Sequence, residues 1–163
     1  MSLSQCCSCV CCVPGQAAGL LLPHLSGTVV LGARESGGRV VLEVRPAAAE
    51  AACPRCGRVS GRVHSRYSRR LRDVPAGGRD VVIVLEACRL RCVNPDCPAV
   101  TFAGQVEGLT SRFARRTPPM AAHPAAVALA LCGRAGSRLA GTLGSAPPSR
   151  QTMIRLVTAV PVP

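Results

Sequence analysis

Two pairs of cysteines enclose the most distinctive part of this chain: residues 53–56 read CPRC and residues 92–97 read CVNPDC. Within each pair, both sulfurs can reach one ion at about 2.3 Å, and four such thiolates form the tetrahedral set that structural zinc prefers. The sequence therefore predicts a structural Zn2+ site held by Cys53, Cys56, Cys92 and Cys97.

The stretch between the two pairs reads as a β-hairpin. Residues 62–65 and 68–73 look extended, PAGG at 75–78 is typical of a turn, and residues 80–91 form a long run rich in β-branched side chains. A hairpin of this length explains why the pairs lie farther apart than the about fifteen to twenty residues of a simple zinc ribbon. We place a zinc-binding β module at residues 51–105.

Two other residues in this module compete as metal ligands. Cys88 lies four residues before Cys92, an even spacing that would put both on one face of a strand. We expect Cys88 to be a small buried apolar residue instead. His64 stands alone among arginines, and we expect it to contact solvent or phosphate.

The charge indicates a polyanionic partner. The net charge is +12, and all twenty basic residues are arginine. Residues 53–97 hold ten arginines against four acids, and residues 98–163 hold seven against Glu107, whereas residues 1–52 are neutral. A field of this sign, concentrated in the middle and the end of the chain, favours double-stranded DNA as the partner.

The region before the first cysteine pair contains two different segments. Residues 1–16 carry five cysteines, Cys6 to Cys12, without knuckle spacing, and we expect a disordered tail or a start codon placed too early; the alternative is a second metal cluster. Residues 28–34 and 39–45 alternate around ESGG, which predicts a β-hairpin in a lead-in segment at residues 17–50. Without a charged leader or a long apolar run, we expect a cytoplasmic, nucleoid-associated protein that has no membrane anchor and no small-molecule substrate.

The chain after the β module turns helical beyond a basic linker at residues 106–116. We expect helices at about 124–132, with Pro124 in the first turn, and at about 135–143, where Ala135 and Leu139 begin a four-residue apolar repeat. Ser149 is a natural N-cap for a third helix. Together these predict a helix-turn-helix unit at residues 117–160 and an α+β chain.

The third helix carries two faces. Met153, Leu156, Val157 and Val160 recur at helical spacing and predict the buried face. Gln151 and Arg155 lie opposite, where they could read bases in a major groove. The alternative is a plain helical hairpin with a solvated charged face. The residues that we expect to contact DNA are Arg66, Arg69, Arg70, Arg115, Arg116, Arg134, Arg138, Arg150, Gln151 and Arg155.

Several motifs in order resemble the N-terminal part of the ISL-three family of insertion-sequence transposases. They are LPHL at 22–25, CPRCG at 53–57, RVHSRY at 62–67, LRDVP at 71–75, RCVNPDCP at 91–98, TFA at 101–103, FARRT at 113–117 and GRAGSRLA at 133–140. The resemblance implies a zinc finger and a helix-turn-helix that recognise the terminal inverted repeats of an insertion sequence, followed by a DDE catalytic domain.

That catalytic domain would begin where this chain ends, so we expect a truncated transposase that binds DNA without catalysing transposition alone. Residues 108–163 contain no acid to hold the divalent cations that such chemistry needs. The alternatives are part of a split or frameshifted active transposase, an inhibitor that dimerises with itself or with full-length transposase, and a remnant without function.

Overall fold

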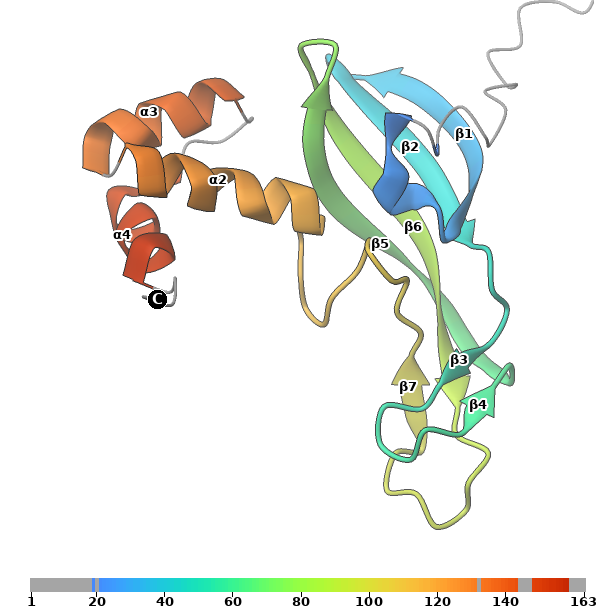
Figure 1. The fold of residues 1–163 in the computed structure, drawn as a ribbon. Helices are drawn as coiled ribbons and strands as arrows, with labels where there is room; N and C mark the ends of the chain where they lie inside the picture. Colours follow the sequence, from blue (N-terminus) through green and yellow to red (C-terminus); the bar gives the residue numbers. More distant parts are fainter. Residues whose placement is uncertain (1–18, 20, 132, 144–147, 159–163) are drawn as a thin grey trace, which may run out of the picture.

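The computed structural model describes residues 19, 21–131, 133–143 and 148–158, which form a twisted β structure with three helices beside it (Figure 1). The main sheet has the order β1-β2-β6-β5, and β7 pairs with the far end of β6. Its strands are β1 (Thr28–Ser36), β2 (Arg39–Pro46), β5 (Val63–Ala76), β6 (Arg79–Arg91) and β7 (Thr101–Ala103). The predicted tail at residues 1–16 lies outside the described residues.

Two tight turns confirm the predicted hairpins. Gly37 and Gly38 join β1 to β2, and Gly77 and Gly78 join β5 to β6, all four with φ between 58° and 74°. Two successive residues with positive φ make the turn whose twist matches paired strands, and glycine adopts that conformation without a Cβ clash. The extended segments expected within residues 62–73 are one continuous strand, β5.

The two hairpins join through a parallel pair that the sequence did not predict. β2 runs beside β6 in the register Arg39↔Asp80 to Val44↔Leu85. The residues 17–50 expected as a lead-in therefore contribute two strands to the sheet that also carries β5 and β6.

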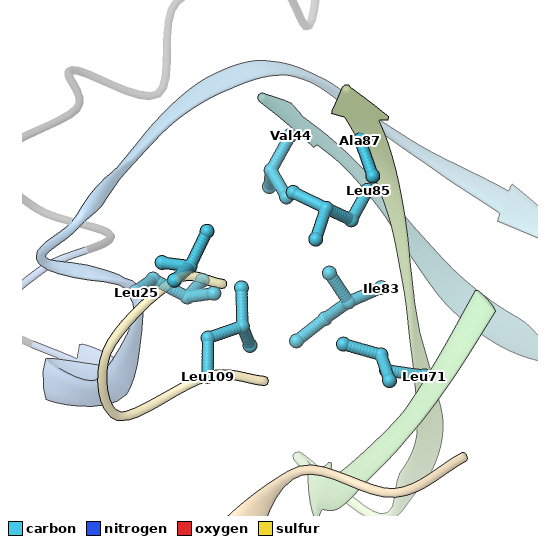
Figure 2. Close-up of a cluster of buried hydrophobic side chains, with 8 residues drawn as sticks. Leu25, Val44, Leu71, Ile83, Leu85, Ala87 and Leu109 are labelled. Carbon is cyan, nitrogen blue, oxygen red and sulfur yellow. The ribbon is translucent and has the colours of Figure 1, made fainter. Parts of the chain in front are cut away.

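One face of this sheet buries an aliphatic core (Figure 2). Leu71, Ile83 and Leu85 point from β5 and β6 toward Leu25 of the short helix η1 (Pro23–Leu25) and Leu109 of the loop after β7. Alternate residues of a strand share a face, so the side chains on either side of each core residue point the other way. This leaves the opposite face of β5 for Arg66, Arg70 and Arg72.

A second, smaller unit lies at the end of the long β5–β6 hairpin, away from its glycine turn (Figure 1). Strands β3 (Ala51–Ala52) and β4 (Val59–Ser60) form a two-stranded sheet around the first cysteine pair. Leu90 of β6 and Phe102 of β7 pair across the strands and are buried with Cys53. The core of this unit is small and consists largely of cysteine.

The helices are α2 (Pro118–Ala130), α3 (Gly133–Leu143) and α4 (Arg150–Thr158), and they pack around Ala128, Ala140 and Met153. α4 follows the predicted N-cap, since Ser149 Oγ accepts a hydrogen bond from Thr152 N–H at 3.2 Å. None of the helices among the described residues is long and apolar enough to cross a membrane.

Two helical predictions were wrong in detail. α2 begins at Pro118 rather than near Pro124, because Thr117 caps it through Met120 N–H and leaves Pro124 inside the helix. In α3, Ala135 and Leu139 are exposed, and the buried positions are one residue later, at Gly136 and Ala140. Val160, expected on the buried face of the third helix, lies outside the described residues.

Candidate metal centre and nucleic-acid interface

The four predicted cysteines meet at one point. Their sulfur atoms all lie within 4.8 Å of one another, with Cys53 Sγ 3.9 Å from Cys97 Sγ and Cys56 Sγ 3.6 Å from Cys92 Sγ. A regular tetrahedron of sulfurs about 2.3 Å from a central ion has edges of about 3.8 Å, so these separations fit zinc. A disulfide would require sulfurs about 2.05 Å apart. The cluster is a structural Zn2+ site.

Each cysteine pair sits in a turn that the backbone closes. In the first, Cys53 N–H donates to Arg58 C=O at 2.9 Å and Gly57 N–H donates to Cys53 C=O at 2.8 Å. Gly57 has φ +74°, a conformation that glycine adopts without a Cβ clash. Ser60 ties this turn to β6 by donating to Arg91 C=O at 2.7 Å. These hydrogen bonds place the first cysteine pair against the long hairpin, next to the second pair.

The first thiol of the cluster is poised to ionise. A hydrogen bond from the backbone N–H of Arg55 outweighs burial and lowers the pKa of the Cys53 thiol to about 7. Thiolate is the form that binds metal. Near neutral pH, a substantial fraction of the Cys53 thiol is therefore already the thiolate that binds zinc.

In the second cysteine pair the pKa of each thiol is raised instead of lowered. The backbone N–H of Asn94 favours the Cys92 thiolate, but burial and the neighbouring sulfurs prevail and raise the pKa of that thiol to about 12. For Cys97 the backbone N–H of Ala99 is likewise outweighed by burial and nearby thiols, and the pKa is raised. Crowded thiolates repel one another, and a divalent cation between them removes that penalty.

The two competing ligands stay outside the cluster. Cys88 is half-buried and packs against the small core of Cys53, Leu90 and Phe102, and it is not among the four clustered sulfurs. His64 is exposed, with Nδ1 3.3 Å from Ser65 Oγ. Neither contributes to the group that could hold the metal.

Several arginines belong to β5 and the linker around the point where these two segments pair, and we call this set the basic edge. Arg72 N–H donates to Arg115 C=O at 3.0 Å, and Thr117 N–H donates to Arg72 C=O at 2.9 Å, so residues 115–117 lie along the free side of β5. The basic edge comprises Arg70, Arg72, Arg112, Arg115 and Arg116. None of these five forms an ion pair with the described residues, whereas Arg34, Arg39 and Arg79 do.

Arg69, which we expected to contact DNA, forms hydrogen bonds within the protein. Its Nη2 donates to Ser111 C=O at 2.5 Å and to Ala114 C=O at 2.6 Å, so the guanidinium holds the linker against β5. A DNA contact by Arg69 stays a prediction, and the structure assigns it an intramolecular role first. Sequence spacing could not reveal a contact between residues this far apart.

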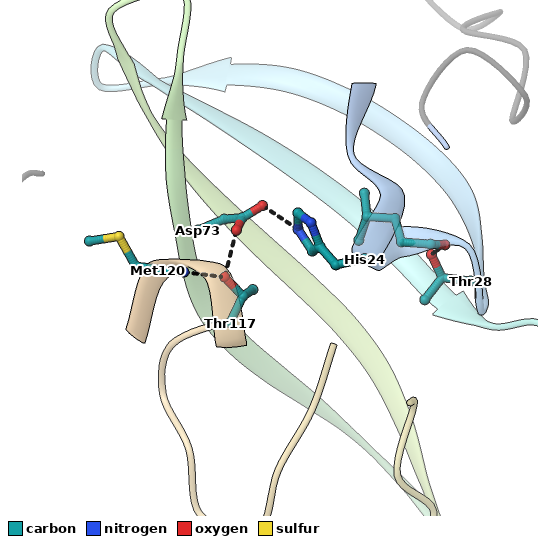
Figure 3. Close-up of polar contacts among 6 residues, drawn as sticks. His24, Thr28, Asp73, Thr117 and Met120 are labelled. Carbon is teal, nitrogen blue, oxygen red and sulfur yellow. Dashed lines mark hydrogen bonds and ion pairs between the residues drawn. The ribbon is translucent and has the colours of Figure 1, made fainter. Parts of the chain in front are cut away.

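A buried carboxylate, which the sequence did not single out, connects three segments (Figure 3). Asp73 of β5 has a fully buried side chain; Oδ2 lies 2.8 Å from His24 Nε2 and Oδ1 accepts a hydrogen bond from Thr117 Oγ1. Thr117 is in turn the N-cap of α2. The only sequence signal was a single acid in the arginine-rich run RRLRDV. This network fixes the start of the helical unit on the sheet.

The helical unit exposes the remaining predicted contacts. Arg134 and Arg138 of α3 are exposed, as are Arg150, Gln151 and Arg155 of α4. In α4 the exposed residues recur at positions 151, 154, 155 and 158, opposite the buried Met153. On β5 and the linker, Arg66, Arg70 and Arg115 are exposed and Arg116 is half-buried.

Comparison with known proteins bears on the cysteine-bounded region. Residues 49–97 match the family model described as the zinc-finger of transposase IS204/IS1001/IS1096/IS1165. No curated protein and no solved structure matches the chain. The matched residues include all four clustered cysteines, the β5–β6 hairpin and Asp73.

Proposed function

We propose that this chain is a zinc-dependent DNA-binding protein that recognises the terminal inverted repeats of an insertion sequence, because residues 49–97 match the zinc-finger model of such transposases. The observation that carries the proposal is the basic edge beside that zinc finger, whose five arginines are unpaired among the described residues. Zinc stabilises the platform, and the arginines supply the affinity.

The platform binds the DNA backbone. Arg70 and Arg72 project from β5, which pairs with β6 and, at Arg72, also with the linker, so the spacing of the two side chains is fixed before DNA arrives. Arginine forms two parallel hydrogen bonds with a phosphate, and each neutralised phosphate releases counterions. If all five arginines of the basic edge contact phosphates, the logarithm of the association constant falls with the logarithm of salt concentration with a slope of about −4.5.

The helical unit reads sequence. We assign α3 and α4 as a helix-turn-helix in which α4 enters the major groove. Gln151 and Arg155 are exposed four residues apart on one face of α4, with the partly exposed Ile154 beside them. Glutamine pairs with adenine, arginine pairs with guanine, and an apolar side chain can pack on a thymine methyl group. In this arrangement Arg134 and Arg138 of α3 face the phosphate backbone of the DNA.

The residues of this chain bind DNA without cutting it. Its eight acids all fall in the described part of the chain, and the only cluster there that could hold a metal is made of cysteines. Asp73, Asp80 and Glu35 are engaged by His24, Arg39 and Arg79. Strand transfer needs carboxylates gathered around divalent cations. Nicking of DNA by the pure protein with magnesium or manganese would overturn this part of the proposal.

The test is a gel-shift titration of the zinc-loaded protein on the terminal inverted repeat of the element and on a scrambled duplex, over a series of salt concentrations. We expect tighter binding to the repeat and a steep salt dependence on both. The Arg155→Ala variant should lose about 10- to 100-fold in discrimination and keep the salt slope. Equal binding to both duplexes refutes sequence reading, and no binding to either refutes the whole proposal.

A second function, self-association, has one structural support. Leu129 and Leu131 near the end of α2 and Leu139 of α3 are 56%, 43% and 38% exposed, which is unusual for leucine on a small helical unit. Such residues suit contact with another copy of the chain. Sedimentation of the zinc-loaded protein tests it: a monomer at all concentrations eliminates the dimerising inhibitor.

A further inference from the structure

The turn at residues 111–114 presents one aromatic side chain to solvent. Phe113 is 83% exposed, the largest exposure of any large hydrophobic residue among the described residues. It is also the only described residue other than glycine with a positive φ, at 62°. For a bulky side chain this left-handed conformation is unfavourable, and such strain tends to persist where a functional group must be held in place.

The surrounding contacts hold this turn rigidly. Ala114 N–H donates to Ser111 C=O at 3.2 Å, which closes the turn and leaves Arg112 and Phe113 at its tip. Arg69 binds the carbonyls at both ends of the same turn. Beyond it, Arg115 and Thr117 are hydrogen-bonded to Arg72 of β5. The exposed ring is therefore displayed from a fixed support and not from a loose loop.

The surroundings of the ring are basic. The Arg112 guanidinium carbon lies 4.7 Å from the centroid of the Phe113 ring, within the range of a cation–π contact. Arg115 and Arg116 follow directly in sequence along β5. An exposed aromatic ring bordered by arginines that form no ion pair within the described part of the chain suits a partner that offers flat apolar surfaces between negative charges. Base pairs between phosphates have that chemistry.

We propose that Phe113 is a wedge that inserts partly between two base pairs of double-stranded DNA, with Arg112 and Arg115 on the flanking phosphates. The proposal rests on the DNA-binding function and assigns a specific contact to it. Single-strand binding is disfavoured, because such sites stack successive bases on several aromatic rings. This chain has only two other large aromatic residues, of which Phe102 is buried and Tyr67 lies on β5.

The unstacking of bases at a single base-pair step can be detected directly by chemical probing. Permanganate oxidises thymines that have lost their stacking, so we would bind zinc-loaded protein to a mixed-sequence duplex rich in TA steps and map the reactive thymines. TA steps unstack most easily. We expect new reactive thymines with the wild type and none with Phe113→Ala at saturating concentrations of each. Phe113→Ala should also bind about tenfold more weakly, and Phe113→Leu should fall between.

Phe113→Gly separates a functional role from a structural one. Glycine accepts a φ of 62° without strain, so this variant should raise the unfolding midpoint by about 3 °C while it abolishes permanganate reactivity. The control is Val100→Ala, which shortens an apolar side chain that is 74% exposed near the cysteine cluster. Val100→Ala should change neither the unfolding midpoint nor the permanganate reactivity of the bound duplex.

The outcomes distinguish this proposal from the one on which it rests. Salt-sensitive duplex binding by the wild type, with reactive thymines that depend on Phe113, supports both. The same binding without reactive thymines, or with thymines that stay reactive in Phe113→Ala, overturns the wedge and leaves the DNA-binding function intact. Reactivity lost equally in Val100→Ala overturns the wedge as well. Failure of the wild type to bind any duplex overturns both.

Discussion

Replacing Asp73 tests how the helical unit is attached to the sheet. Asp73→Ala removes a fully buried carboxylate and leaves His24 and Thr117 without their shared partner. Hydrogen bonds to a charged group contribute about 1.5–3 kcal/mol each, and breaking a buried pair typically costs about 3–5 kcal/mol. We therefore expect a loss of about 4 kcal/mol in the free energy of unfolding. That is a large share of the roughly 5–15 kcal/mol available to a domain.

The chain offers a matched control for this variant. Asp80 also pairs with a basic side chain, but it is 28% exposed and lies 3.6 Å from Arg39. Exposed pairs contribute at most about 1 kcal/mol, so Asp80→Ala should be close to neutral. Both variants would be unfolded with urea in the zinc-loaded state and followed by circular dichroism, with zinc content measured first to confirm that the cysteine cluster is intact.

The role of Thr117 gives the stricter test. Thr117→Val removes both the hydrogen bond to Asp73 and the cap of α2, so it should cost about 2 kcal/mol alone. Combined with Asp73→Ala, the two losses should fall short of additivity by at least about 1 kcal/mol, because they share one interaction. Additive losses, or an Asp73→Ala variant as stable as Asp80→Ala, would refute the idea that this carboxylate ties α2 to β5.

Three further predictions concern the cysteines and the helical unit. Cys92→Ser should lose the bound zinc and the structure of the β3–β4 region, while Cys88→Ser keeps one zinc per chain; metal analysis of the two purified proteins decides. At pH 8 the Cys53 thiol, with a pKa of about 7, is already mostly ionised, whereas Cys92, with a pKa of about 12, is not. Zinc binding should therefore release a full proton from Cys92 and almost none from Cys53, so calorimetry in buffers of different ionisation enthalpy should find fewer than four protons released. Gly136→Ala would place a Cβ 1.7 Å from a backbone carbonyl and should cost about 3 kcal/mol or more, seen as lost helicity on mild heating, whereas Gly32→Ala meets nothing within 4 Å and should be nearly neutral.

The sequence predicted those features that depend on neighbouring residues. The cysteine spacing identified the four metal ligands, because a knuckle needs only a few residues to bring two sulfurs together. Paired glycines located both tight turns, since few other residues adopt positive φ twice in succession. Ser149 located the start of α4 for a similar local reason, a side chain that accepts a hydrogen bond three residues ahead.

Most of the features that the sequence did not predict depend on contacts between residues distant in the chain. Asp73 meets His24 across 49 positions and Thr117 across 44, and no periodicity encodes either contact. The same contacts explain why α2 starts at Pro118, since Thr117 becomes a cap once Asp73 holds it. Single-sequence patterns also misplaced the buried face of α3 by one residue. In α3 the backbone carbonyl of Leu131 approaches position 136 so closely that only glycine fits there, and a large apolar side chain does not.

The long strand β5 runs from the cysteine-bounded β3–β4 unit to the attachment point of the helical unit and sets their separation. The β3–β4 unit with its cysteine cluster adjoins the start of β5 at Val63, and the network that carries α2 adjoins Asp73, ten residues farther along. At about 3.3 Å per residue these points lie at most about 33 Å apart, which is close to one turn of B-form DNA at about 34 Å. Arg55, Arg58 and Arg62 are exposed in the β3–β4 unit, so we propose that this unit and the helical unit contact the same side of a duplex in successive turns. Hydroxyl-radical footprinting on the inverted repeat should find two protected patches about one turn apart, and Cys92→Ser should lose the patch protected by the β3–β4 unit while the patch protected by the helical unit remains. A single protected patch shorter than a turn, unchanged by loss of zinc, would contradict this arrangement.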